Sequence, residues 1–538
     1  MILNSQDMRA RLAQSVACLN AGDPKGAAGH LAPLSAAYPD EPSVRFVNGL
    51  IDLFEGRPQD AENQFRLVLA SGQVPPQLYA AFARALSAQG KVSEAVSAYK
   101  KAVAFFPEDA VLKFELAGLQ QASGDFDGAT ENLRTVLSLA PGVTAARAGL
   151  ASVQDRQGKH EEAIASYKNI LAANPLDMDA HRHLNELLHR LGRSEEFLTS
   201  YDAASRARPD VAALPLHKGG ELLKTGRAAE ARDAFEQVLK IAPTDCTARN
   251  GLAAALEALG ETEVAHRVVE ENLKLHPDEP VALLDYAKAM LLRDEPARAL
   301  PLLERGLRLA PEYQSFPALL GLCYRALGDA REEPLNGYEH LIQGFDLDPP
   351  EGFSDMESFN RELDAYLAEL QTDRRSYLTQ TQRGGSRLFQ DVFGGGHDLV
   401  NRLRHRIDDA LRRYISSLPT DDAHPFLRRR QKAFAYNGSW STRLVDCGYH
   451  VNHIHVGWIS SAYYIAVPDA AADQKSKQGW IKFGEAPEEF GNRYAARRTI
   501  QPRRGRLVLF PSYMWHGTVP FRSAQHRATI AFDVIPKP

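Results

Sequence analysis

The pattern of apolar and polar positions along the chain changes from a helical period to short alternating segments near Lys432. In the ranges 352–372 and 399–418, apolar residues recur every three or four positions, which predicts two amphipathic helices. Beyond Lys432, apolar or alternating segments are divided by Gly, Pro, Asp and Asn, which predicts strands. These predicted strands are 434–436, 440–445, 461–467, 479–483, 506–510 and 528–535. Such a profile is typical of a jelly roll, or double-stranded β-helix, braced by helices.

Upstream of these elements, a glycine recurs with a constant spacing of 34 residues. The series is Gly22, Gly56, Gly90, Gly124, Gly158, Gly192, Gly226 and Gly260, continued by Asp294 and Gly328. Five residues after most turns stands an Ala, which allows two helices to approach closely, and Phe197 is the exception. In most units a Pro follows seventeen residues after the turn and stops the second helix. The predicted unit is therefore helix, Gly turn, helix, Pro stop.

This period and these positions resemble the tetratricopeptide repeat over about residues 4–328. The resemblance implies an all-α superhelix whose concave surface binds peptides or protein segments. A spacer or a dimerisation arm is the alternative, because nothing in the sequence identifies a ligand. We thus predict a multidomain chain, with the repeat array at 1–333 and the jelly-roll domain at 334–538.

Three histidines in the strand-rich part have the spacing of a metal site. In an extended strand, residues two apart share a face, so His453 and His455 would present two imidazoles side by side. His516 lies 61 residues after His455, beyond a buried strand and a Pro-containing turn. Three such donors on neighbouring strands could face one metal ion. His450 and His526 have the opposite strand parity to their neighbouring candidates, so we interpret both as non-ligands.

The same stretch resembles the iron- and 2-oxoglutarate-dependent dioxygenases over about residues 425–538. Their motif is His-x-Asp, a distal His, and an Arg about ten residues later with a hydroxyl residue two positions beyond. His453 matches the first position, His516 the distal one, and Arg527 with Thr529 the last pair. The chain departs from the motif at the carboxylate, because His455 stands there.

The resemblance implies Fe(II) at His453, His455 and His516, with 2-oxoglutarate and molecular oxygen as cosubstrates and no catalytic residue beyond the metal centre. Arg527 suits the far carboxylate of 2-oxoglutarate, since its planar fork binds a carboxylate bidentately, and Thr529 would add a hydroxyl on the same strand face. Tyr463 is a further candidate for the cosubstrate pocket. Tyr463 and its neighbour Tyr464 are equally well explained as core residues.

We therefore expect an Fe(II)- and 2-oxoglutarate-dependent oxygenase, a hydroxylase whose repeats recruit a protein or peptide substrate. One alternative is a three-His iron dioxygenase that uses no 2-oxoglutarate, against which Arg527 argues. The other is a non-catalytic repeat adaptor with an inactive oxygenase fold, which His455 in the carboxylate position favours.

Composition and sequence pattern indicate which partners and which cellular compartment to expect. The 538 residues are 44% hydrophobic and 24% charged with a net charge of −5, and neither nucleic acid nor membrane is an expected partner. No stretch reaches 18 uninterrupted apolar residues, and the N-terminus lacks a signal-peptide pattern. The cysteines form no CxxC pair, and we interpret them as buried free thiols. Together these features predict a cytoplasmic protein.

Overall fold

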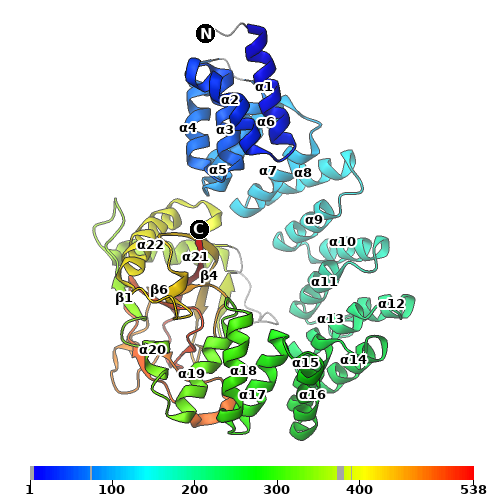
Figure 1. Ribbon diagram of the computed structural model, residues 1–538, viewed down its shortest axis with the longest axis vertical. Coiled ribbons are helices and arrows are strands. Elements are labelled where there is room, and N and C mark those ends of the chain that lie inside the picture. The colour runs from blue at the N-terminus through cyan, green and yellow to red at the C-terminus, as the bar shows by residue number, and fades with distance from the viewer. Residues whose placement is uncertain (1–4, 73–74, 372–380, 389–390, 538) are drawn as a thin grey trace. The chain divides into compact units, whose positions relative to one another are not determined.

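The computed structural model describes residues 5–72, 75–371, 381–388 and 391–537 (Figure 1). It divides into two compact units. One unit is Met1–Ile170 with Phe393–His397, and the other is Leu171–Val392 with Asp398–Pro538. The domain boundary that we predict at 333/334 lies inside the second unit. The division into units does not test whether the repeats end there, so this boundary stays a prediction.

The first part of the chain consists of short helices of similar length. In the first unit and across its end these are α1 (Ser5–Asn20), α2 (Pro24–Ala37), α3 (Pro42–Phe54), α4 (Pro58–Ala70), α5 (Gln77–Ala88), α6 (Val92–Phe105), α7 (Ala110–Ser123), α8 (Phe126–Leu139), α9 (Thr144–Arg156) and α10 (His160–Ala173). In the second unit they are α11 (Met178–Arg190), α12 (Thr199–Ala207), α13 (Ala213–Lys224), α14 (Ala228–Ile241), α15 (Cys246–Ala258), α16 (Thr262–Leu275), α17 (Pro280–Leu292), α18 (Pro296–Leu309) and α19 (Ser315–Leu327).

The turn residues of the repeat explain why the spacing is so constant. Every glycine of the series has a φ between 62° and 84°, a left-handed conformation in which a side chain is unfavourable. Asp294, which replaces glycine once, adopts the same conformation at a φ of 62°. Where Phe197 replaces the small residue, the second helix starts late, and α12 has only 9 residues whereas α14 has 14. The late start coincides with Leu198, which adopts a left-handed conformation with a φ of 67° directly before α12.

The remainder of the second unit is strand-rich and carries three further helices, α20 (Glu332–Asn336), α21 (Met356–Leu370) and α22 (Asp398–Ser417). Its strands are β1 (Gln343–Asp346), β2 (Gln382–Arg383), β3 (Ser386–Leu388), β4 (Ala433–Leu444), β5 (Tyr449–His450), β6 (Ile459–Ala466), β7 (Ile481–Phe483), β8 (Arg498–Ile500), β9 (Arg506–Pro511), β10 (His516–Thr518) and β11 (Arg527–Lys537). They form a six-stranded sheet in the order β1-β9-β6-β11-β4-β3, a three-stranded sheet β10-β7-β8, and the pair β2-β5.

This arrangement confirms the predicted fold class, tetratricopeptide-repeat helices followed by a jelly-roll domain that helices brace. One helix, α21, packs on β6, where the Tyr463 hydroxyl donates to Asn360 Oδ1 at 2.7 Å. The predicted strands 434–436 and 440–445 are in fact one strand, β4. Its register shifts opposite Phe532 and Val534, where Gly438 has a φ of 122°. The glycine thus produces a bulge within a strand rather than a turn between two strands.

The last repeat helices pack directly against the strand-rich part (Figure 1). Arg325 of α19 donates to the carbonyl oxygens of Gly484 at 2.9 Å and Ala495 at 2.8 Å. The Trp515 indole donates to the Ala318 carbonyl at 3.1 Å, and Phe490 is buried in the same apolar cluster as the repeat helices. The β-rich part is therefore braced by repeat helices as well as by its own.

The cysteines differ from expectation in one respect. All four are free, but only Cys323 is buried: Cys18 and Cys246 are half-buried, and Cys447 is exposed in a left-handed turn position after β4 with a φ of 61°. Among the described residues, no helix combines the length and apolar character needed to cross a membrane.

Phe490 tests how strongly the repeats and the strand-rich part stabilise each other. Phe490→Ala should lower the free energy of unfolding of the second unit by about 3–5 kcal/mol, because the ring is 1% exposed in the shared cluster. All four tryptophans lie in the second unit, so fluorescence during urea unfolding measures this change.

The matched control is Leu275→Ala at the end of α16, where the side chain is 47% exposed. This substitution should cost less than about 1 kcal/mol. Equal losses in the two variants would show that the cluster at Phe490 contributes nothing specific.

Candidate metal centre

The segment between β5 and β6 carries two of the three histidines, and it is not the continuous strand that we predicted. His453 forms an isolated antiparallel bridge with His516, with His453 N donating to His516 O at 2.9 Å and His516 N to His453 O at 3.1 Å. His455 N donates to Ser512 O at 2.9 Å. The segment stays extended because His453 and His455 are both hydrogen-bonded to the turn from Ser512 to His516. The two histidines therefore share a face, as predicted, although no continuous strand forms there.

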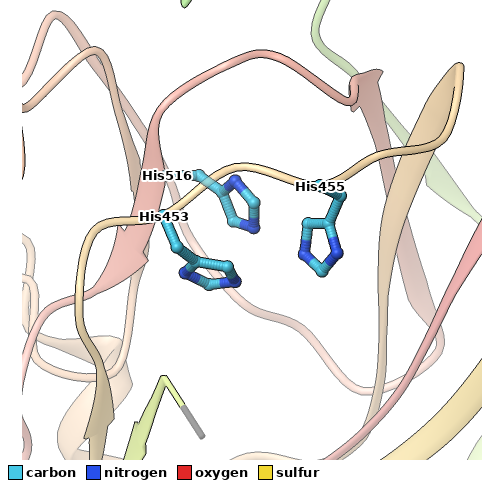
Figure 2. A group of neighbouring side chains, drawn as sticks. All are labelled: His453, His455 and His516. Atoms are coloured by element: carbon cyan, nitrogen blue, oxygen red, sulfur yellow. The ribbon is translucent and has the colours of Figure 1, made fainter. Parts of the chain in front are cut away.

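Three imidazole rings converge from these segments (Figure 2). Their candidate ligand atoms all lie within 4.8 Å of one another. The ring centroid of His453 is 4.3 Å from that of His516 and 4.9 Å from that of His455. The structure therefore brings together the three residues that the sequence predicts as metal ligands.

The second nitrogen of each ring already faces an acceptor. His453 Nδ1 lies 2.7 Å from the Val451 carbonyl and His516 Nδ1 lies 2.9 Å from the Met514 carbonyl. His455 Nδ1 lies 3.2 Å from Asp533 Oδ2. An acceptor at Nδ1 places the proton there and leaves the Nε2 lone pair available, which is how metal-binding histidines are usually oriented. The donor set therefore fits a divalent transition-metal ion.

Burial keeps the imidazoles of His453 and His516 in the neutral form that metal binding requires. Loss of hydration, followed by the neighbouring His455, lowers the pKa of His453 to about 3. Burial also holds the pKa of His516 well below its usual range, with His453 and His455 adding to the effect. Neutral, closely spaced nitrogens in a buried pocket are ready to bind a cation without first releasing protons.

The wall of the pocket is formed by β11 and its neighbours. Arg527 and Thr529 both line the pocket that holds the three histidines, so the predicted cosubstrate residues lie beside the predicted ligands. Arg527 is 3% exposed, its Nε has no hydrogen-bond partner, and its guanidinium lies 4.9 Å from the Tyr464 ring centroid. Tyr463 does not reach this pocket, because strand alternation turns it toward α21 and Asn360.

The two histidines that we interpreted as non-ligands are also accounted for. His450 lines the pocket, but its Nδ1 lies 3.3 Å from Thr381 Oγ1 and it is outside the group of converging ligand atoms. His526 Nε2 lies 2.8 Å from Asp364 Oδ2 and is not among the lining residues.

Comparison with protein families supports this site. Residues 438–533 match the family described as "Putative 2OG-Fe(II) oxygenase". Residues 46–110, 149–212 and 216–280 match one tetratricopeptide repeat family, and 86–153 match another. The chain joins tetratricopeptide repeats to a 2OG-Fe(II) oxygenase domain. All of the pocket residues predicted from the sequence, and Asp533, fall within the matched oxygenase range.

Comparison with solved structures adds likenesses of low identity. One is a tetratricopeptide repeat protein from Parabacteroides merdae ATCC 43184, at 20% identity, covering 41% of this chain and 88% of that one with a TM-score of 0.30. Another is the structure of Naa15/Naa10 bound to HypK-THB, at 15% identity, covering 69% of each chain with a TM-score of 0.32. No curated protein matches the chain.

Sequence reasoning missed Asp533 in the oxygenase domain. This carboxylate is 4% exposed and contacts His455, although the two residues are far apart in sequence. Strand parity gives a signal that could have found it, since Asp533 is an even number of residues from Arg527 and therefore shares its face of β11.

The depressed histidine pKa values predict how the metal-free protein responds to acid. Between pH 6.5, the usual His pKa, and about 3, the unfolded chain binds a proton at His453 that the folded chain excludes. Stability is therefore complete above pH 6.5 and falls as the pH drops through this window. From pH 7 to 5 the loss at this residue is on the order of 2 kcal/mol. Urea titrations of metal-free protein, followed by tryptophan fluorescence, measure it.

Replacing His453 by Gln should reduce this pH dependence by the share of one histidine, while the buried His516 keeps its own share. His526→Gln, outside the pocket, serves as the control and should retain the slope of the original protein. Identical slopes in all three proteins would contradict the burial of a neutral imidazole at His453.

Proposed function

We propose that this protein is an Fe(II)- and 2-oxoglutarate-dependent oxygenase that hydroxylates a protein or peptide substrate recruited by its repeats. The observation that carries the proposal is Arg527, a buried cation beside three converging imidazoles. Among the described residues no carboxylate forms an ion pair with it. A buried charge without a counterion is costly, so the pocket is built for an anion that arrives with the reaction.

A dicarboxylate cosubstrate satisfies both halves of the pocket. Its far carboxylate would form an ion pair with the guanidinium of Arg527 and accept a hydrogen bond from the Thr529 hydroxyl. Its other end would reach the metal held by the histidines. Fe(II) with 2-oxoglutarate and molecular oxygen supplies the oxidising chemistry of this class. The protein's own contribution is to hold neutral imidazoles, offer one cation at a fixed distance from them, and bury both.

Each alternative conflicts with one feature of the site. A three-His dioxygenase that uses no 2-oxoglutarate would leave the buried cation of Arg527 without an anionic ligand. An inactive adaptor does not need three converging histidines whose Nδ1 atoms all face acceptors. The oxygenase that uses 2-oxoglutarate accounts for both observations.

The repeats supply the argument for a macromolecular substrate. Tetratricopeptide repeats generally bind protein segments, and the first unit contains a groove of about 560 Å³ between α1, α3 and α5. Its lining is mainly apolar and includes Phe54, which is 55% exposed. An extended segment with apolar side chains is the kind of ligand that this groove supports.

Turnover without a known substrate provides the first test. With ascorbate as the electron donor in place of a substrate, metal-free protein reconstituted with Fe(II) should convert 2-oxoglutarate to succinate and CO2 with uptake of oxygen, and His516→Ala should abolish both signals. Oxygen uptake that does not need 2-oxoglutarate would favour the three-His alternative. Failure to bind Fe(II) at all would favour the adaptor.

Arg527→Ala tests the cosubstrate pocket. The variant should still bind the metal but lose about 2–5 kcal/mol of affinity for 2-oxoglutarate, because a buried carboxylate would remain without its cation. The KM for 2-oxoglutarate and direct titration both report this change. Arg522→Ala, an exposed arginine near the start of the same strand, should behave like the original protein.

The substrate itself can be sought with the same variant. Protein carrying Arg527→Ala and a bound metal should retain partners that the repeats recruit, and mass spectrometry would identify them. Hydroxylation of a retained partner by the original protein, and not by His516→Ala, is the expected result.

A further inference from the structure

Asp533 is the buried carboxylate that faces the metal centre from behind a ligand. Its Oδ2 lies 3.2 Å from His455 Nδ1, and the residue is 4% exposed. His455 in turn occupies the position where the oxygenase motif has a carboxylate. The negative charge that is absent from the ligand position is thus present one residue farther from the metal.

A chain of buried hydroxyls fixes the orientation of this carboxylate. Ser460 Oγ donates to Asp533 Oδ1 at 2.6 Å, and Ser512 Oγ lies 2.9 Å from Ser460 Oγ. Because Ser460 donates its single proton to the carboxylate, Ser512 is the donor in the second contact. One carboxylate oxygen is therefore held by the β6 hydroxyl, and the other remains directed at His455.

The backbone around Asp533 is shaped to allow this close approach. A Cβ atom at Gly457 would lie 2.9 Å from Asp533 Cβ and 3.0 Å from Ser512 Oγ, so a side chain there would displace the pair. Asp533 pairs with Ser460 across β6 and β11, beside the bulge in β4. Glycine and bulge together leave room for a carboxylate inside the sheet.

One face of strand β11 carries both a cation and an anion. Arg527, Thr529 and Ala531 line the pocket, and Asp533 follows with the same parity. The face therefore begins with the cation that we assign to the cosubstrate and carries, farther along, the anion that contacts His455.

We propose that Asp533 is a positioning residue for the metal, which acts through His455 and supplies the charge that the motif's carboxylate would otherwise supply. The inference rests on the proposed function, in which His455 is a metal ligand. A carboxylate on Nδ1 fixes the ring orientation and the tautomer, and it makes the opposite nitrogen a stronger donor. His455 and Asp533 together thus replace one directly bound carboxylate.

Arg387 defines the competing explanation. The charge of Asp533 acts on this arginine, whose pKa burial lowers to about 10, and the guanidinium lies 4.8 Å from the centroid of the Trp440 ring. Trp440 in turn stacks on His455 with ring centroids 5.3 Å apart. If Asp533 only balanced Arg387, its removal would affect stability and leave metal affinity unchanged.

Titration with Co(II) in the absence of 2-oxoglutarate and oxygen separates these roles. Asp533→Asn keeps the size of the side chain and removes its charge, and it should lower Co(II) affinity by about 10–100-fold. The visible absorption of bound Co(II) should shift as well, since the His455 donor changes. Unchanged affinity and an unchanged spectrum would overturn the proposal.

The chain offers a matched control in a second His–Asp pair. Asp364 Oδ2 lies 2.8 Å from His526 Nε2, so Asp364→Asn removes a His–Asp contact outside the pocket, together with the ion pair of Asp364 with Arg443 at 2.7 Å. This variant should bind Co(II) with the affinity of the original protein. An equal loss in both variants would indicate a general effect on stability and would contradict the proposal.

A double substitution distinguishes charge supply from a structural role. With Asp at position 455, the metal has a direct carboxylate, and the charge of Asp533 lies next to a like charge. In the His455→Asp background, Asp533→Asn should therefore leave Co(II) affinity unchanged or raise it. A structural role for Asp533 would instead lower affinity in both backgrounds.

Two measurements keep this inference separate from the proposed function. If the original protein binds no Co(II) or Fe(II), the metal centre itself is wrong. If it binds and Asp533→Asn binds equally well, only the role of Asp533 is wrong. Should Asp533→Asn fail to fold, judged by the unfolding of metal-free protein, Ser460→Ala takes its place. Ser460→Ala keeps the charge of Asp533 but removes the hydrogen bond that orients its carboxylate. Unchanged Co(II) affinity in this variant would also count against the proposal.

Discussion

The paired backbones of His453 and His516 are the constraint on which the site depends. Their two hydrogen bonds hold the peptide groups of both residues at fixed separation, so the rings meet with centroids 4.3 Å apart. A rigid pair of donors of this kind loses little entropy when a metal binds. His455 joins them because its own amide is fixed to Ser512, on the same turn that leads to His516. One short stretch of antiparallel pairing thus positions the whole ligand set.

The residues beside these two ligands connect the site to the repeats. Trp515, next to His516, donates to the Ala318 carbonyl in α19. Asn452, next to His453, donates to the Ala486 carbonyl at 2.8 Å, and Ala486 belongs to the apolar cluster that contains the last repeat helices. The final repeats therefore contribute to the position of the candidate ligands His453 and His516. A boundary drawn where the 34-residue period ends follows the sequence pattern, but it cuts through this packing.

The sequence allowed the repeats and the ligand set to be predicted because both depend on local rules. A left-handed turn requires glycine or a tolerant residue such as Asp294, so the period is visible without a structure. Residues two apart in extended backbone share a face even where no ladder forms, so His453 and His455 were correctly paired. Strand parity places Asp533 on the face of Arg527, but its contact with His455 could not be predicted, because the two residues lie on segments far apart in the sequence. Tyr463 was a candidate for a similar reason, since only the sheet shows which of two adjacent tyrosines faces α21.

Charge balance gives a physical reason for a carboxylate behind a histidine. In the proposed function, a divalent metal, Arg527 and the nearby buried Arg387 would bring positive charge to the pocket region, and a dicarboxylate cosubstrate would offset only part of it. Asp533 would supply a further negative charge, through its contact with His455. Because this charge would lie behind His455 and not on the metal, the metal would keep a stronger attraction for incoming anions than a directly bound carboxylate would leave it. The departure from the motif at His455 therefore moves a charge by one side chain and does not remove it from the site.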